Sequence, residues 1–141
     1  MKTAGALAGA LVVMVCGMAG DALATVRVNV DTDSQTMHVY VNGKLRHEWR
    51  VSTGRRGYDT PSGSFRPQRM ERQWYSRKYD DAPMPNSIFF SGGYAIHGTN
   101  QVGRLGRRAS HGCIRLAPSH AAQLYNLVSA HRGNARIAID D

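Results

Sequence analysis

The chain has 141 residues, with 18 lysines and arginines against 10 aspartates and glutamates and a formal net charge of +8. This length suits one domain with one hydrophobic core. The positive charge would suit anionic wall polymers, lipid head groups or nucleic acid, and the lack of a recognisable nucleic-acid-binding motif in the sequence argues against the last of these. A solvated basic surface accounts for the same charge without any partner.

The first residues have the composition of a secretory signal peptide. Lys2 opens a short basic region, residues 4–15 are apolar or small, and an Ala-Leu-Ala sequence at 22–24 supplies a cleavage site. The apolar run is shorter than the roughly 20 residues of a membrane span. We therefore expect a signal peptide over 1–24, a mature domain over 25–141 without a membrane span, and export to the periplasm or cell wall.

Alternating apolar and polar residues predict strands along most of the chain. An Asn-Gly pair at 42–43 predicts a hairpin turn, and its second strand is expected to place Leu45 and Trp49 among its apolar contacts. His38 and His47 are expected at the surface or in the pleat, without partners. The predicted strands cover 26–30, 37–41, 44–51, the end of 60–65, 88–90, 94–97 and 135–139.

Residues 67–87 fit neither the helical nor the strand period. They combine three prolines and several arginines with Trp74, Tyr75 and Tyr79. A loop of this length inside a small domain is often a lid or a binding loop. We expect Trp74 and Tyr79 to contact a sugar or peptide substrate, and the alternative is that both rings pin the loop to the core.

The final third of the chain contains the one clear helix. A basic, glycine-rich loop is predicted over 98–110, and Pro118 suits the first turn of a helix. An Arg-Gly pair at 132–133 is expected to end this helix with a cationic last turn and a C-cap glycine, with His120 and His131 on the solvent side. The helical apolar face comprises Ala121, Leu124, Tyr125, Leu127 and Val128. The excess of strands predicts a mainly β fold, a sandwich or barrel with one helix near the C-terminus.

The segment 110–115, Ser-His-Gly-Cys-Ile-Arg, carries the residues with the clearest chemistry. Cys16 leaves with the signal peptide, so Cys113 is the single thiol of the mature chain, in a polar context that favours exposure. A thiol needs a nearby base or positive charge to act as a nucleophile at neutral pH. Two histidines are candidates for this base, and the spacing does not choose between them. His97 lies at a predicted strand end, and His111 faces the same way as Cys113 in an extended chain.

The neighbours of Cys113 suit acyl transfer better than metal binding. The backbone N–H groups of Gly112 and Cys113 are candidates for an oxyanion hole. Arg115 is a candidate for lowering the thiol pKa or holding a substrate carboxylate, with a salt bridge at the sheet edge as the alternative. A catalytic zinc site of His97, His111 and Cys113 is disfavoured, because no neighbouring carboxylate or further ligand motif accompanies them.

Segment 110–115, preceded by the strand that ends in His97, Gly98 and Thr99, resembles the active-site signature of the L,D-transpeptidase (YkuD-type) catalytic domain. Residues 60–65, Thr-Pro-Ser-Gly-Ser-Phe, are similar to a second motif of that family. The resemblance extends over residues 26–139. The gap between His97 and Ser110 is shorter than in the family pattern, which implies a trimmed active-site loop and altered substrate access.

The resemblance implies an L,D-transpeptidase-like fold and an exported cysteine acyltransferase that acts on peptidoglycan stem peptides without a metal or other cofactor. Cys113 would attack the carbonyl of the third stem residue and release D-alanine. An amine of another stem, a wall-linked protein or a free amino acid would then resolve the thioester. His97 would be the base, with the Gly98 carbonyl orienting its ring, and carbapenems would acylate Cys113. The expected substrate contacts are Trp74, Tyr79, Thr99, Ser110, His111 and Arg115.

Two other functions fit the same sequence. With water as the acceptor the site would be an L,D-carboxypeptidase, or an amidase-type hydrolase that trims or detaches wall-linked proteins. A protein of another class would be a non-catalytic wall-binding module that uses the basic surface and the aromatic residues of 67–87.

Overall fold

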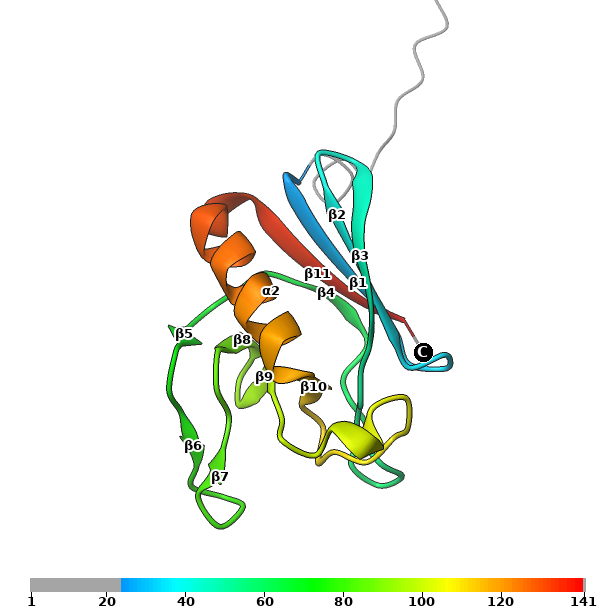
Figure 1. Ribbon diagram of the computed structural model, residues 1–141, viewed down its shortest axis with the longest axis vertical. Coiled ribbons are helices and arrows are strands. Elements are labelled where there is room, and N and C mark those ends of the chain that lie inside the picture. The colour runs from blue at the N-terminus through cyan, green and yellow to red at the C-terminus, as the bar shows by residue number, and fades with distance from the viewer. Residues whose placement is uncertain (1–23, 141) are drawn as a thin grey trace, which may run out of the picture.

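The computed structural model describes residues 24–140, so the predicted signal peptide lies outside the described residues except for Ala24. Strands predominate in this part of the chain, and α2 is its single α-helix (Figure 1). This arrangement confirms the predicted mainly β class with one helix near the C-terminus.

The larger sheet contains the first and last strands of the described chain. Its order is β3-β2-β1-β11-β4, with β1 and β11 parallel and the other pairs antiparallel. Val26, Val28 and Val30 are fully buried and alternate with partly exposed residues, so one face of β1 lies in the core. The strands are β1 (Val26–Asp31), β2 (Thr36–Val41), β3 (Lys44–Arg50), β4 (Gly63–Phe65) and β11 (Ala135–Asp140).

The smaller sheet positions the candidate site. Its order is β10-β9-β8-β5, with β9 and β10 parallel. Ile88 and Phe90 join the main core, whereas Phe89 packs with Met84 and Ala95 in a second cluster. Strand β8 is therefore covered on both faces, which explains why its sequence is a continuous apolar run. The strands are β5 (Met70–Glu71), β8 (Ser87–Ser91), β9 (Tyr94–Gly98) and β10 (Ile114–Leu116).

Residues 67–87 hold more regular structure than predicted. Strand β5 joins the smaller sheet, and β6 (Tyr75–Ser76) pairs with β7 (Ala82–Pro83) in a hairpin that projects at the bottom of the view (Figure 1). We call this segment the β6–β7 hairpin. Strands of two residues are too short to show a period, which is why the sequence pattern did not reveal them.

Helix α2 (Pro118–Ala130) begins as predicted and ends differently. Proline occupies its first turn, and the helix packs against β8 and β9. Its C-cap is His131, at φ −130°, and the residues predicted to cap it belong to the 3-10 helix η2 (Arg132–Asn134). The His131 N–H bonds to the Val128 carbonyl at 3.1 Å, and Gly133 does not adopt a left-handed φ. The predicted glycine C-cap and cationic last turn were therefore wrong.

The β2–β3 hairpin has the predicted turn but not the predicted apolar contacts. Asn42 and Gly43 adopt φ of 51° and 78°, as a tight Asn-Gly turn requires. Trp49 is buried, whereas Leu45 is 51% exposed. The pairing shifts between Val39 and Tyr40, and this bulge turns Leu45 to the face opposite Trp49.

His38 and His47, which were expected to have no partners, both have one, and His120, which was expected on the solvent side, shares the partner of His47. The Trp49 ring is stacked between His47, at a centroid distance of 4.5 Å, and His120, at 4.8 Å. His38 lies 3.6 Å from the Glu48 carboxylate. The stack joins β3 to the first turn of α2.

Over residues 24–140 we find no helix with the length and apolar content of a bilayer span. The longest described helix, α2, has 13 residues.

Candidate functional site

The predicted catalytic residues meet at the carboxyl end of β9 and the start of β10. His97 is the Cα partner of Arg115 in this parallel pair. Cys113 lies two residues before Arg115, so in an extended chain its side chain shares the face that carries Arg115 and His97. A cleft of about 1080 Å³ opens here. The residues assigned to the site from the sequence that line this cleft are Trp74, Tyr79, His97, Thr99, Ser110, His111, Cys113 and Arg115.

His97 is a buried, neutral imidazole. It is 6% exposed, and its Nδ1 lies 2.7 Å from the Gly98 carbonyl oxygen, the contact that the resemblance implied. A carbonyl oxygen only accepts, so Nδ1 carries the proton and Nε2 keeps its lone pair. Burial lowers the pKa of His97 to about 4, the Gly98 carbonyl opposes this shift, and the charge of Arg115 adds to it. At pH 7 the ring can therefore accept a proton.

Cys113 is half-buried, less open than its polar context predicted. It packs against the cluster of Met84, Phe89 and Ala95. Burial raises the pKa of the Cys113 thiol, and the Ala95 backbone and the charge of Arg115 partly offset that rise. The resting site thus combines a protonated thiol with a neutral imidazole, and a thiolate forms only when the proton is taken up.

Ser110 braces the turn that carries Cys113. Its buried Oγ donates to the Cys113 carbonyl oxygen at 2.6 Å and accepts the Gly112 N–H at 3.1 Å. The hydroxyl is engaged within the protein, and its predicted contact with a substrate stays a prediction. The Gly112 N–H is engaged as well, which leaves the Cys113 N–H as the remaining candidate donor for the predicted oxyanion hole.

Gly112 is required by the shape of the same turn. Its φ is +117°, and a Cβ at this position would lie 2.5 Å from Cε1 of Tyr94. Glycine accepts this backbone conformation and this close approach, whereas other residues resist both. Tyr94, which the sequence analysis did not assign, thereby shapes the cleft beside Cys113.

His111 lies between two tyrosine rings. Tyr79 stacks on it at a centroid distance of 4.1 Å, and Tyr58 meets it edge-on at 5.0 Å. Burial lowers the pKa of His111, as do the charges of Arg55, Arg115 and Lys78. Tyr79 therefore reaches from the β6–β7 hairpin to the turn that carries the thiol.

Trp74 pins its segment to the core, and its predicted contact with a substrate stays a prediction. The indole lines the cleft, and it also packs edge-on against Phe89 at 5.8 Å, so it pins the segment to the smaller sheet. Arg69 lies over the same ring at 4.2 Å. Thr99 is buried, and its Oγ1 accepts the Gln101 N–H at 3.1 Å.

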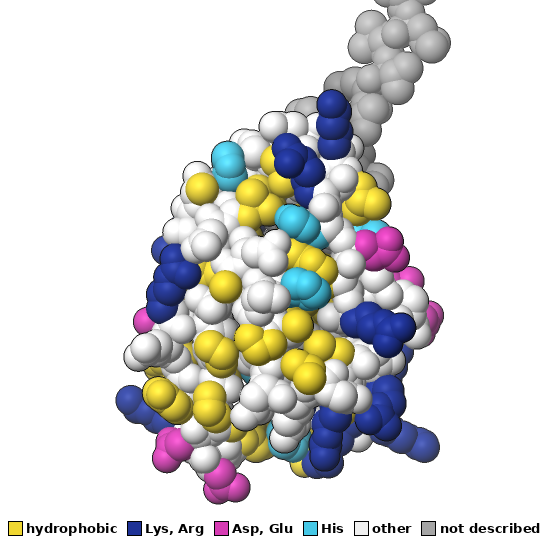
Figure 2. Space-filling model, in the orientation of Figure 1, with side chains coloured by type: hydrophobic (Ala, Val, Ile, Leu, Met, Phe, Trp, Pro, Cys, Tyr) yellow, Lys and Arg dark blue, Asp and Glu magenta, His cyan; other side chains and the backbone are white. Residues whose placement is uncertain are grey.

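The cleft is strongly cationic. One carboxylate residue, Asp80, lines it against six cationic side chains, which are Arg55, Arg69, Arg77, Lys78, Arg104 and Arg115. Figure 2 shows lysine and arginine side chains gathered at the lower right of the molecule, the end at which η1 (Val102–Arg104) lies in Figure 1. Arg104 was not assigned from the sequence, although the basic composition of 98–110 signalled such a residue.

Arg115 holds a buried donor without an internal acceptor. Its Nη1 has no hydrogen-bond partner among residues 24–140. No carboxylate in that range forms an ion pair with Arg115, so the structural salt bridge considered from the sequence is absent there. The guanidinium faces the cleft with its charge uncompensated.

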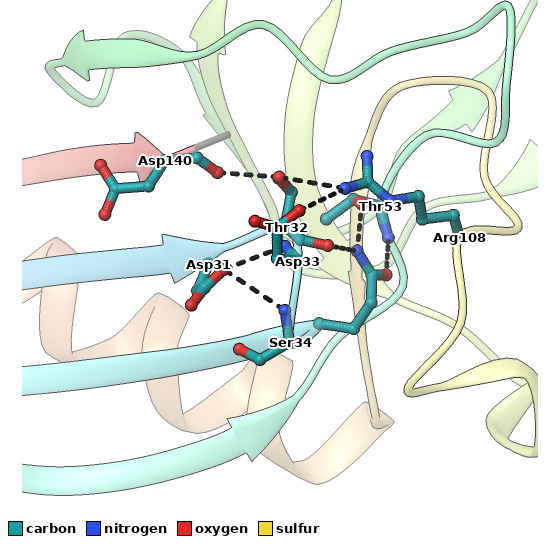
Figure 3. A network of polar contacts seen from close by, with 8 residues as sticks. Asp31, Thr32, Asp33, Ser34, Thr53, Arg108 and Asp140 are labelled. Atoms are coloured by element: carbon teal, nitrogen blue, oxygen red, sulfur yellow. Dashed lines mark hydrogen bonds and ion pairs between the residues drawn. The ribbon is translucent and has the colours of Figure 1, made fainter.

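A network of polar contacts supports the Ser110 turn from behind. Gln35 donates to Thr53 Oγ1 at 2.6 Å and accepts the Thr53 N–H at 2.9 Å, and Thr53 in turn accepts the Ser110 N–H at 2.9 Å. Arg108 extends the network by an ion pair of 3.3 Å to Asp33 (Figure 3). The 98–110 loop is therefore anchored to the turn between β1 and β2.

No set of three or more histidine, cysteine, aspartate or glutamate side chains is placed to hold a metal ion within the described chain. The three residues weighed as zinc ligands thus do not form such a group in this structure.

Comparison with known proteins points to one family. The family model of the L,D-transpeptidase (YkuD) catalytic domain matches residues 25–137. YqjB of Bacillus subtilis (strain 168), which carries an L,D-transpeptidase name, is 26% identical over 127 residues, covering 81% of this chain and 70% of its own length.

The fold is likewise that of solved L,D-transpeptidases. An L,D-transpeptidase from Mycobacterium smegmatis superposes with a TM-score of 0.76 at 24% identity, covering 84% of this chain and 59% of its own. The LD transpeptidase LdtMt1, solved in complex with imipenem, gives a TM-score of 0.74 at 22% identity, covering 83% of this chain and 59% of its own. The chain thus spans less than two thirds of these structures, and the predicted L,D-transpeptidase-like fold is confirmed.

Proposed function

The chain belongs to the L,D-transpeptidase catalytic-domain family, and we propose that it is an exported cysteine acyltransferase that transfers peptidoglycan stem peptides from Cys113 to an amine. The observation that carries this proposal is the pairing of β9 with β10, which puts the thiol and a buried neutral imidazole on one face at the cleft. The cationic lining of the cleft also supports the proposal, because it suits a carboxylate-bearing peptide.

In the first half-reaction, the sulfur of Cys113 attacks the carbonyl carbon of the third stem residue while Nε2 of His97 accepts the thiol proton. The Cys113 N–H donates to the oxygen that becomes negative. The bond to D-alanine then breaks, its amine leaves with the proton from His97, and a thioester on Cys113 remains. His97 is favoured over His111 as the base because its Nδ1–H is held by the Gly98 carbonyl, whereas His111 is packed between two tyrosines.

In the second half-reaction, an acceptor amine attacks the thioester carbonyl carbon. Its proton passes to His97, the carbon–sulfur bond breaks, and the proton returns to the sulfur of Cys113. A new amide bond has then replaced the bond to D-alanine. Water in place of the amine would give a free carboxylate, which is the carboxypeptidase outcome.

Arg115 is assigned to recognition of a substrate carboxylate. A buried donor without a partner costs about 1–3 kcal/mol, and a bound carboxylate would offset that cost at the Nη1 atom. Arg104 lines the same cleft and lowers the pKa of Arg115 by its charge, after the larger effect of burial. Neither arginine forms an ion pair within residues 24–140, so this pair of cations suits a ligand that brings negative charge.

The test is to incubate the purified protein with tetrapeptide muropeptides and follow D-alanine release and dimer formation by mass spectrometry. We expect both products, and neither from Cys113→Ala. Release of D-alanine by Cys113→Ala at the wild-type rate would contradict the proposal. D-alanine release without dimers, even with added amine, would identify the carboxypeptidase. Retention on wall sacculi without any D-alanine release would identify a binding module.

A further inference from the structure

We infer that Thr60 is a positioning residue for acyl transfer, whose hydroxyl fixes the Gly112–Cys113 peptide so that the Cys113 N–H faces the developing oxyanion. The inference rests on the proposed function and extends it to a residue outside the lining of the cleft. It also gives a role to the Thr-Pro motif at 60–65, which by sequence alone fits an ordinary turn.

Thr60 is a buried residue in an exposed stretch. It is 7% exposed, whereas Asp59 before it and Ser62 after it are exposed. Its Oγ1 accepts the Gly54 N–H at 2.9 Å and donates to the Gly112 carbonyl oxygen at 2.8 Å. A hydroxyl has a single proton, so this proton is committed to the residue directly before the thiol.

The bond to Gly112 sets the direction of the Cys113 N–H. Both groups belong to one peptide unit, and the described chain contains no cis peptide bond. In a planar trans peptide the C=O and N–H bonds point in opposite directions. Since Thr60 draws the carbonyl toward its own loop, the N–H of Cys113 points away from that loop.

The other hydrogen bonds of the turn do not hold the Gly112–Cys113 peptide itself, so this peptide can still change its orientation. Ser110 Oγ holds the Gly112 N–H and the Cys113 carbonyl, which are the groups on either side of it. Gly112 has the backbone freedom of glycine at φ +117°. Without the Thr60 hydroxyl, the peptide can rotate about Gly112 and the Cys113 N–H loses its fixed direction. Transition-state stabilisation depends on donors that are aimed before the reaction begins.

The experiment compares a reaction that forms an oxyanion with one that does not. Imipenem acylation and D-alanine release both pass through a tetrahedral oxyanion at a carbonyl carbon, whereas iodoacetamide alkylates the thiol at a saturated carbon. In Thr60→Val we expect acylation and kcat to fall by about 10- to 100-fold, with the donor KM and the alkylation rate near wild type. Thr60→Ser, which keeps the hydroxyl, should restore most of the acylation rate.

Thr36→Val is the matched control, because Thr36 donates to Ser34 in the turn between β1 and β2 and should give wild-type rates. Wild-type acylation in Thr60→Val would overturn the inference, as would equal losses of acylation and alkylation. Thermal unfolding of each variant checks the fold. If Thr60→Val does not fold, the acylation and alkylation rates are compared in Thr60→Ala instead. Absence of D-alanine release from the wild type would instead refute the proposed function, while imipenem acylation would still report on Thr60.

Discussion

The rings of Tyr79 and His111 lie face to face, with centroids 4.1 Å apart and planes 13° from parallel. Tyr79 lies in the turn of the β6–β7 hairpin, and His111 lies in the turn that carries Cys113. This stack therefore joins two segments of the cleft wall that share no strand ladder. The stack adds to the packing of Trp74 on Phe89 in holding the hairpin beside the site.

Removal of this stack should weaken substrate binding more than chemistry. Aromatic pairs contribute about 0.5–1.5 kcal/mol beyond their buried area, so Tyr79→Ala should raise the KM of the tetrapeptide donor by about 2- to 10-fold with a smaller change in kcat. Steady-state D-alanine release measures both constants. Tyr75→Ala is the control, because Tyr75 belongs to the same hairpin but is 56% exposed and does not line the cleft. Equal effects of the two substitutions would contradict the role of the stack.

Burial of His97 should make the free energy of unfolding depend on pH. Its pKa is about 4 in the folded chain against an ordinary value of 6.5. Between these values the unfolded chain binds a proton that the folded chain does not, so stability is lost as the pH falls through this window. At about 1.4 kcal/mol per pKa unit, the full loss attributable to His97 is about 3 kcal/mol.

Urea unfolding between pH 4 and pH 7 measures this dependence. The stability of the wild type should fall toward pH 4 more steeply than that of His97→Gln, which removes the titrating ring. Parallel stability curves for the two proteins would show that His97 does not titrate with the shifted pKa.

Hairpin formation and helix initiation were predictable because their causes are local. The Asn-Gly pair at 42–43 and Pro118 act through their own backbone preferences. Leu45 was misplaced because a bulge in the β2–β3 pairing, which the alternating sequence pattern does not reveal, reverses the alternation of β3. The end of α2 was misplaced because His131, and not the following glycine, closes it.

The candidate site divides in the same way. His97 at the end of β9 and the reactive segment at 110–115 were identified from the chain, with the Gly98 contact supplied by the resemblance. The hydrogen-bond partners of Ser110 and Thr60 could not be predicted, because the sequence around a hydroxyl does not indicate which acceptor it will bond. The Thr60 bond spans 52 positions, and only the folded chain brings the two ends together.

Arg115 should control the ionisation of the nucleophile. Its positive charge stabilises the thiolate, so its removal should raise the pKa of Cys113 further and slow alkylation by iodoacetamide at pH 8. Arg115→Gln should show this loss and Arg115→Lys should recover part of the rate. Arg66→Gln, an exposed change outside the cleft lining, is the matched control. Wild-type alkylation by Arg115→Gln would contradict the electrostatic role.

Gly112→Ala should damage the site through shape. The added Cβ would lie 2.5 Å from Tyr94, and φ of +117° is unfavourable for alanine. We expect a loss of stability of about 1–3 kcal/mol, measured by urea unfolding, together with slower acylation. Gly103→Ala is the control, since nothing lies within 4 Å of the corresponding Cβ.

Tyr94→Ala in the Gly112→Ala background separates the two causes. The double substitution removes the steric contact but leaves the backbone strain, so it should recover part of the lost stability. No recovery would show that the strained backbone alone accounts for the effect.

The most direct test of the account is the intact mass of the protein after exposure to imipenem, the ligand present in the LdtMt1 structure. If Cys113 is the acyl-transfer nucleophile, the wild type should gain the mass of one imipenem-derived acyl group, and peptide mapping should place it on Cys113. Cys113→Ala should keep its original mass. An unmodified wild type, or an adduct that persists in Cys113→Ala, would contradict the assignment of Cys113 as the nucleophile.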